Sequence, residues 1–174
     1  DLIDERKTFK IMSAASLLLE LKQQAEIAQT PADWAQVLTS LDRESGYDFS
    51  DTGRLLHTSS GAISSTGNHK LFIPFLYLRA RALHKLNRVR ECTAMLEIGF
   101  RHDPENASGE FPLDLQLVFG AEKLRKEDFV AAVDLVSRVV RHPHGRAEKK
   151  AWVVLCRALF ALERQQQTIG IAYG

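Results

Sequence analysis

Hydrophobic residues recur along this chain at the three- and four-residue spacings of amphipathic helices, and strand-like alternation is nearly absent. One apolar stripe runs from Leu2 to about Ala28 and predicts a long helix or two joined helices. The stretch Thr30-Pro31-Ala32-Asp33 offers an N-cap, a proline at the first helical position and an acid at the third. A second helix is expected to start there and to end near Gly46. The pattern as a whole predicts an all-α protein.

The composition changes between Ser45 and Lys70, where Ser, Thr, Gly, Asp and Asn dominate. Such a segment is too polar and too rich in glycine to bury much, so we interpret 45–70 as a polar flexible loop, with a short helical turn around Arg54-Leu55-Leu56. Its hydroxyl side chains are candidates for phosphorylation, although a loop of this kind is more often a connector. The predicted organisation is therefore 1–44, N-terminal amphipathic helices that pack on the rest; 45–70, loop; and 71–174, paired helices.

From Phe72 onward the helical stretches come in pairs, and small residues recur at fixed places. Aligning Ala80 with Gly120 and Cys156 brings three segments into register, approximately 73–105, 113–145 and 149–174. A tight turn at Leu86-Asn87-Arg88 separates the two helices of the first segment, and the third segment ends in what we interpret as its second helix. We expect the paired helices to approach closely at the small residues, since a position that faces a neighbouring backbone admits only Gly, Ala or Cys. An ordinary antiparallel bundle is the alternative.

This pattern resembles the tetratricopeptide repeat (TPR), in which small and large residues alternate over about 34 residues and a proline closes each unit. Pro104 and Pro143 occupy the closing positions of the first two segments. The distance from Ala80 to Gly120 exceeds the usual repeat by about six residues, which fall in the loop "ENASGE". The resemblance implies a short TPR-like α-solenoid of stacked antiparallel pairs, with about seven or eight helices in the chain.

In repeats of this family the first helix of each pair lines a concave groove that binds a peptide. The matching positions in this chain are Tyr77, Arg81, His84, Lys85, Asp114, Leu117, Ala121, Leu124, Arg125, Lys150, Val153, Arg157 and Phe160. The groove is basic with an apolar floor, which suits an acidic peptide with hydrophobic anchors. The resemblance therefore implies a non-enzymatic adaptor or scaffold that binds a protein partner. Alternatively, the N-terminal helix or the segment after Gln165 covers the groove.

Charge leaves two further alternatives open. The 23 basic and 22 acidic residues nearly cancel, so no overall field favours nucleic acid or a membrane surface. A local basic cluster, "RVVRHPHGRAEKK", has Arg138, Arg141 and Arg146 around a turn, and an RNA-binding helical repeat is one alternative. The other is a homodimerisation module in which the apolar stripe of the N-terminal helix pairs with a second copy.

The sequence gives little support for a catalytic site. Of the six histidines only His142 and His144 lie close together, with no cysteine or carboxylate at metal-ligand spacing, so neither a metal nor another cofactor is expected. Cys92 and Cys156 lie in apolar helical patterns and are expected to be free, buried thiols, which indicates a reducing compartment such as the cytoplasm or nucleus. The apolar runs are too short to span a bilayer. The first residue is Asp1 rather than methionine, which is consistent with a fragment of a longer chain.

Overall fold

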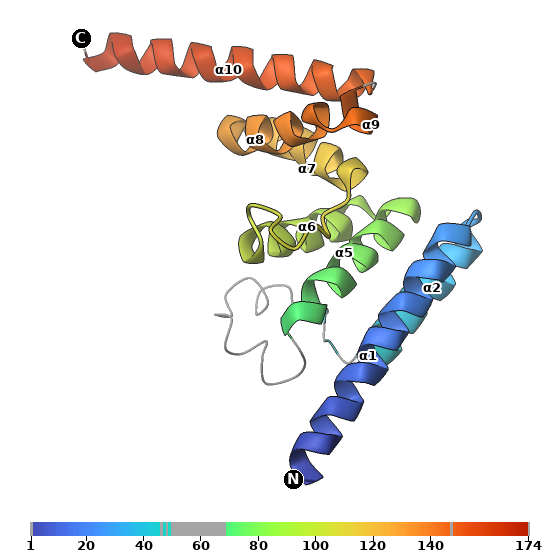
Figure 1. Cartoon of the computed structure of the whole chain (residues 1–174). Helices are drawn as coiled ribbons and strands as arrows, with labels where there is room; N and C mark the ends of the chain where they lie inside the picture. The colour runs from blue at the N-terminus through green and yellow to red at the C-terminus, as the bar shows by residue number, and fades with distance from the viewer. Residues whose placement is uncertain (1, 46, 48, 50–68, 147, 174) are drawn as a thin grey trace. The chain divides into compact units, whose positions relative to one another are not determined.

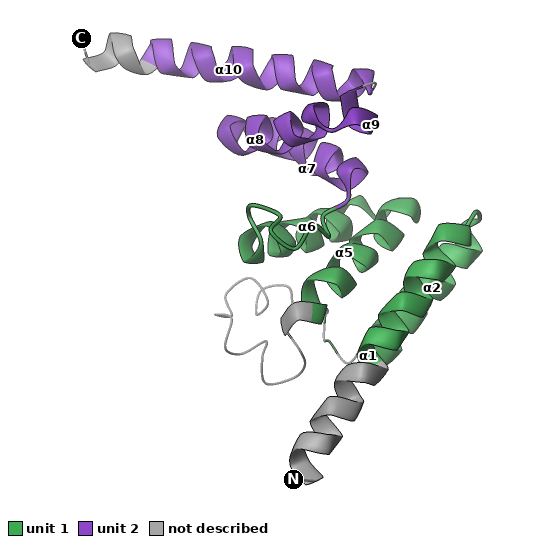
Figure 2. Ribbon diagram, in the orientation of Figure 1, with its two compact units in different colours: residues 1–111 green, residues 112–174 purple. Residues whose placement is uncertain are grey.

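The computed structural model describes residues 2–45, 47, 49, 69–146 and 148–173, and every regular element in them is an α-helix (Figure 1). The all-α prediction is confirmed. The chain divides into two compact units, residues 1–111 and 112–174 (Figure 2). Unit 1 contains α1 (Leu2–Ile27), α2 (Pro31–Glu44), α5 (His69–Lys85) and α6 (Val89–His102). Unit 2 contains α7 (Leu113–Arg125), α8 (Phe129–Arg141), α9 (Pro143–Arg146) and α10 (Lys149–Tyr173). Most of the predicted loop, with the turn at Arg54-Leu55-Leu56 and the candidate phosphorylation sites, lies outside the described residues.

Helix α2 begins where its cap predicts. The Thr30 hydroxyl accepts a hydrogen bond from the backbone N–H of Asp33 at 3.3 Å, and the Asp33 carboxylate accepts one from the backbone N–H of Thr30 at 2.8 Å. These bonds to Thr30 lower the pKa of Asp33 because they favour its ionised form. The buried face of α2 consists of Trp34, Val37, Leu38 and Leu41, and the helix packs against α1 and α5. The N-terminal helices are thus built into unit 1.

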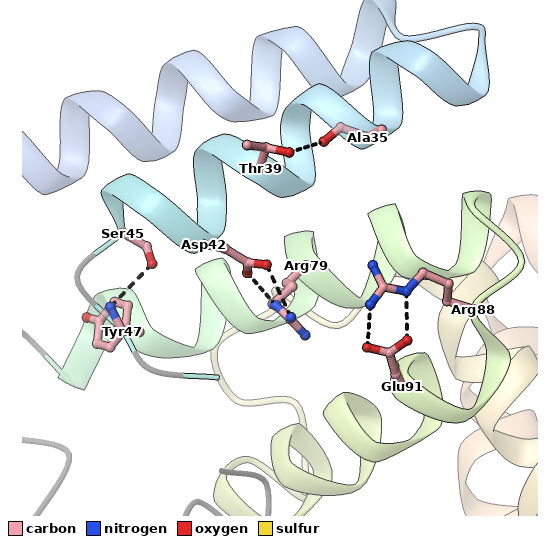
Figure 3. Close-up of polar contacts among 8 residues, drawn as sticks. All are labelled: Ala35, Thr39, Asp42, Ser45, Tyr47, Arg79, Arg88 and Glu91. Carbon is pink, nitrogen blue, oxygen red and sulfur yellow. Dashed lines mark hydrogen bonds and ion pairs between the residues drawn. The ribbon is translucent and has the colours of Figure 1, made fainter. Parts of the chain in front are cut away.

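A cluster of aromatic rings follows α2 directly. Tyr47 and Phe49 are both buried, Tyr47 meets Phe72 edge-on at 5.3 Å between centroids, and Phe49 stacks on Phe72 at 6.2 Å. Arg79 of α5 belongs to the same cluster, because its guanidinium lies 5.3 Å from the centroid of the Phe49 ring. The Nε of Arg79 also donates a hydrogen bond to Asp42 Oδ1 at 2.7 Å (Figure 3). Little burial is expected from the composition after Ser45, but Tyr47 and Phe49 are buried and connect the end of α2 to α5.

The tight turn predicted at Leu86-Asn87-Arg88 joins α5 to α6. The Arg88 N–H donates to the Leu83 carbonyl at 2.9 Å and the Asn87 N–H to the His84 carbonyl at 3.0 Å. This pair of bonds is a Schellman motif, which requires one residue with left-handed backbone geometry. Asn87 supplies it with φ 57°.

The same turn recurs forty residues later, between α7 and α8. The Asp128 N–H donates to the Lys123 carbonyl at 2.9 Å, the Glu127 N–H donates to the Leu124 carbonyl at 3.1 Å, and Glu127 has φ 61°. The offset equals that between Ala80 and Gly120 (80 to 120, 87 to 127). Two helix pairs in this chain therefore share one connection and one register.

Glycine allows close helix approach in both pairs. A Cβ on Gly99 of α6 would lie 2.7 to 2.8 Å from ring atoms of Tyr77 on α5, and one on Gly120 of α7 would collide with the Val136 side chain of α8. Ala80 and Ala132 are fully buried as well. The prediction that size is limiting at these small positions is confirmed.

The loop "ENASGE" is held in place by hydrogen bonds to Asp103, which precedes it. The Asp103 carboxylate accepts hydrogen bonds from the backbone N–H groups of Ala107 (2.7 Å) and Ser108 (3.1 Å). Phe111, at its end, is buried and stacks on Tyr77 at 4.5 Å between centroids. Glu110 forms a 2.7 Å ion pair with Lys22 of α1. The extra residues of the first segment thus connect three elements of unit 1.

Unit 2 is closed on one side by α10. Its residues Ala151 and Leu155 join Val136, Val139 and Val140 of α8 in one buried cluster. Helix α10 is a single helix from Lys149 to Tyr173, whereas the alignment of the three segments predicts a second helix near the end of the chain. No partner helix therefore follows α10 within the described residues.

Replacing Gly120 by leucine should lower the free energy of unfolding by about 1–3 kcal/mol, because the new side chain must displace Val136 in a packed interface. The matched control is Ala121→Leu, one residue further on the same helix and exposed. That change should stay within about 0.5 kcal/mol. Urea denaturation followed by circular dichroism measures both, and equal losses would contradict close packing at Gly120.

Burial raises the pKa of Tyr47 to about 12, so its phenol stays protonated in the folded chain above pH 10, where an exposed tyrosine ionises. Stability should therefore be unaffected by this group below pH 10 and should fall as the pH rises from 10 towards 12. The titration of phenolate absorbance measures this pKa. The absorbance of the native chain minus that of the Tyr47→Phe variant gives the contribution of Tyr47 alone among the three tyrosines. A difference midpoint near 10 would show that Tyr47 is not buried.

Candidate partner-binding surface

The predicted groove residues of unit 1 are largely covered. Tyr77 is only 1% exposed, between Gly99 and the Phe111 ring, so it belongs to the core rather than to a binding surface. The Arg81 guanidinium lies 5.9 Å from the centroid of the Trp34 ring on α2, and its Nε is buried with no hydrogen-bond partner among the described residues. Arg81 is therefore partly covered by α2, whereas the covering elements expected from the sequence are the N-terminal helix or the segment after Gln165.

His84 and Lys85 lie in the last turn of α5. His84 is half-buried, and Lys85 is exposed. The His84 carbonyl accepts the hydrogen bond from the Asn87 N–H in the turn into α6. These positions suit the negative end of a helix dipole. They lie next to the covered part of α5 and do not form a surface with Tyr77.

On α7 the predicted residues differ in exposure. Leu117 is partly buried against the cluster formed by α8 and α10, and Leu124 is also half-buried. Arg125 is exposed and forms a 2.7 Å ion pair with Glu122 on the same helix. The hydrogen bond from Arg125 lowers the pKa of Glu122, so this guanidinium already has an anionic neighbour.

The four predicted residues on α10 are all exposed. Lys150, Val153, Arg157 and Phe160 follow one another at spacings of three and four residues, which places them along one side of the helix. Val153 is 50% and Phe160 62% exposed. Neither Lys150 nor Arg157 pairs with an acid in the part of the chain that the structure describes. We call these four residues the basic-apolar stripe.

One neighbour of the stripe was missed in the sequence. The Arg164 guanidinium lies 5.9 Å from the centroid of the Phe160 ring, one turn further along α10. Its spacing from Arg157, seven residues, equals that between Arg157 and Lys150, so the repeat of basic residues was visible. Arg164 continues the stripe by another turn.

Cys156 corrects a further expectation. Both cysteines are free, as predicted, but only Cys92 is buried, and Cys156 is exposed. The sequence placed Cys156 at a close-packing position by analogy with Ala80 and Gly120. No described helix follows α10 along the chain to cover this position as α6 follows α5 and α8 follows α7, and Cys156 is exposed.

The basic cluster around the turn after α8 is less concentrated than its sequence suggests. Arg138 forms a 2.6 Å ion pair with Asp134 one turn earlier, while Arg141 and Arg146 are exposed. The Arg146 carbonyl accepts a hydrogen bond from the indole N–H of Trp152 at 2.9 Å, which holds this aromatic ring against the turn. The indole is therefore oriented by the protein rather than being a free stacking platform.

Groups of three or more potential metal ligands are not found among the described side chains. None of the described helices is long and apolar enough to cross a membrane. Comparison with family models, with curated proteins and with solved structures finds no match. The single groove expected to join Arg81 to Arg157 stays a prediction, since these residues belong to different units.

Charge reversal at Arg81 and at Arg157 should have different effects on the melting temperature. Arg81→Glu should lower the melting temperature, because it places a carboxylate in a partly buried site facing the Trp34 ring. Arg157→Glu changes an exposed side chain and should move the melting temperature little. Thermal unfolding followed by circular dichroism tests both variants, and equal shifts would show that Arg81 is as free as Arg157.

Proposed function

We propose that this chain is a non-enzymatic adaptor domain of TPR-like helix pairs, which binds an acidic segment of a protein partner through the basic-apolar stripe on α10. The observation that carries the proposal is the alternation of exposed basic and apolar side chains at Lys150, Val153, Arg157 and Phe160. The recurring Schellman turn and the glycine contacts support the repeat architecture. No cofactor takes part in this function, and the free thiols suit the cytoplasm.

The chemistry of the partner follows from the stripe. Basic residues recur every seven positions and apolar residues alternate with them, so a helical partner should present acids and hydrophobic side chains at the same spacing. Burial of Val153 and Phe160 would contribute most of the affinity, because exposed apolar side chains lose water contact on binding. Lys150 and Arg157 would set the charge of the partner and the rate of encounter.

The test uses a fluorescent synthetic peptide of about four helical turns, with Glu and Leu alternating at three- and four-residue spacing. Fluorescence anisotropy should show binding that weakens with salt. Arg157→Glu should reduce affinity at least about tenfold, and Phe160→Ala should cost about 1–3 kcal/mol. A peptide with Lys in place of Glu should not bind.

Arg141→Glu is the matched control, since Arg141 is exposed and basic but lies on α8. It should leave peptide binding unchanged. An equal loss with Arg141→Glu, or no effect of Arg157→Glu, would rule out the stripe as the binding face. Tight binding of a single-stranded RNA oligonucleotide that Arg141→Glu abolishes would favour the RNA-binding alternative instead.

A further inference from the structure

A second face of α10, beside the basic-apolar stripe, is also open. At about 100° per residue, Lys149 and Glu163 lie about 20° from Cys156 around the helix, Trp152 about 40° and Leu159 about 60°. Trp152 is 45% and Leu159 47% exposed. These five residues repeat at spacings of three and four, the pattern of a helix-packing seam. We call them the α10 seam. Phe160 and Val153 of the stripe lie at about the same angles from Cys156 as Trp152 and Leu159, but on its other side, so the two faces share an edge.

The corresponding residues of the other first helices are buried. Forty residues separate Gly120 from Ala80 and thirty-six separate it from Cys156, and at this alignment Trp152 and Leu159 correspond to Leu76 and Leu83 on α5. Both leucines are 0% exposed, on the helix that packs against α6. On α7, Gly120 itself contacts Val136 of α8. In the pair α7/α8, then, the residue aligned with the centre of the α10 seam faces the second helix.

The two ends of the α10 seam have opposite charges, so the seam of one copy is complementary to that of an antiparallel copy. Lys149 and Glu163 each lie seven residues from Cys156, on opposite sides, about 10 Å along the helix axis. A two-fold axis at Cys156 would therefore bring Lys149 of one copy level with Glu163 of an antiparallel copy, twice per pair. The same axis would place Trp152 close to Leu159 of the partner copy.

We propose that the α10 seam binds a second copy of this chain, forming an antiparallel α10 pair centred on Cys156. A two-fold interface must be complementary to itself, and this seam has an apolar centre with one opposite charge at each end. The copy supplies the helix that is present in the pairs α5/α6 and α7/α8. This inference does not depend on the proposed peptide binding, although Phe160, about 40° from Cys156 around the helix, borders both faces.

The first experiment is sedimentation equilibrium of the whole chain at micromolar concentrations, where we expect a reversible dimer. Leu159→Glu should raise the dissociation constant at least about tenfold, because it places two carboxylates in the apolar centre. Val130→Glu is the matched control: Val130 is 67% exposed on α8, and its change should leave the dimer intact. Circular dichroism confirms that each variant is folded.

The second experiment tests the register. Lys149→Glu and Glu163→Lys should each raise the dissociation constant about three- to tenfold, since each creates two like-charge pairs. The double variant restores both pairs and should return the constant to near its original value. Oxidation with diamide, which takes up two electrons and two protons as the two Cys156 thiols join, should give a covalent dimer that Cys156→Ser abolishes.

A monomer at every concentration would overturn the proposal. So would a dimer that is insensitive to Leu159→Glu, because its contact would then lie elsewhere, for example on the N-terminal helix. Failure of the double charge exchange to restore association would exclude the antiparallel register. The peptide assay with Arg157→Glu reports on a residue about 100° around the helix from Cys156, so its result is distinguishable from each of these outcomes.

Discussion

Two helices can pack closely only where one of them has no side chain in the way, and this constraint shapes both helix pairs of the chain. Gly99 admits the Tyr77 ring in unit 1, and Gly120 admits Val136 in unit 2. Interiors packed at crystal-like density leave no space for an extra methyl group at such points. The Schellman turns then need only three residues to reverse the chain, because the helices they connect already lie close together.

Features that depend on local spacing could be predicted from the sequence. The Thr30 cap, the Asn87 turn and the small residues at Gly99 and Gly120 each follow from a short run of residues. Tyr47 and Phe49 could not be found in this way, since they are single aromatic residues in a polar stretch and become buried only when α5 packs beside them. Local composition contains no signal for that contact.

The same distinction between local spacing and distant contacts applies to the candidate binding residues. Spacing correctly placed Val153, Arg157 and Phe160 on one side of a helix, because helical geometry alone decides it. Spacing also put Arg81 in the same class, yet the structure places it beneath Trp34. Which face of a helix is covered depends on elements distant in the sequence, so aligned positions on two helices, such as Tyr77 and Val153, can be buried in one and exposed in the other.

The short turns and the distant contacts also indicate an order of folding. The pairs α5/α6 and α7/α8 bring together residues close in sequence, and such contacts form quickly because little chain entropy is lost in closing them. The ion pair between Asp42 and Arg79 spans 37 residues and that between Lys22 and Glu110 spans 88. We therefore expect the docking of α1 and α2 onto α5 to follow the formation of the two pairs. In that order the contact between Asp42 and Arg79 would form late, and its loss would act mainly on the unfolding rate.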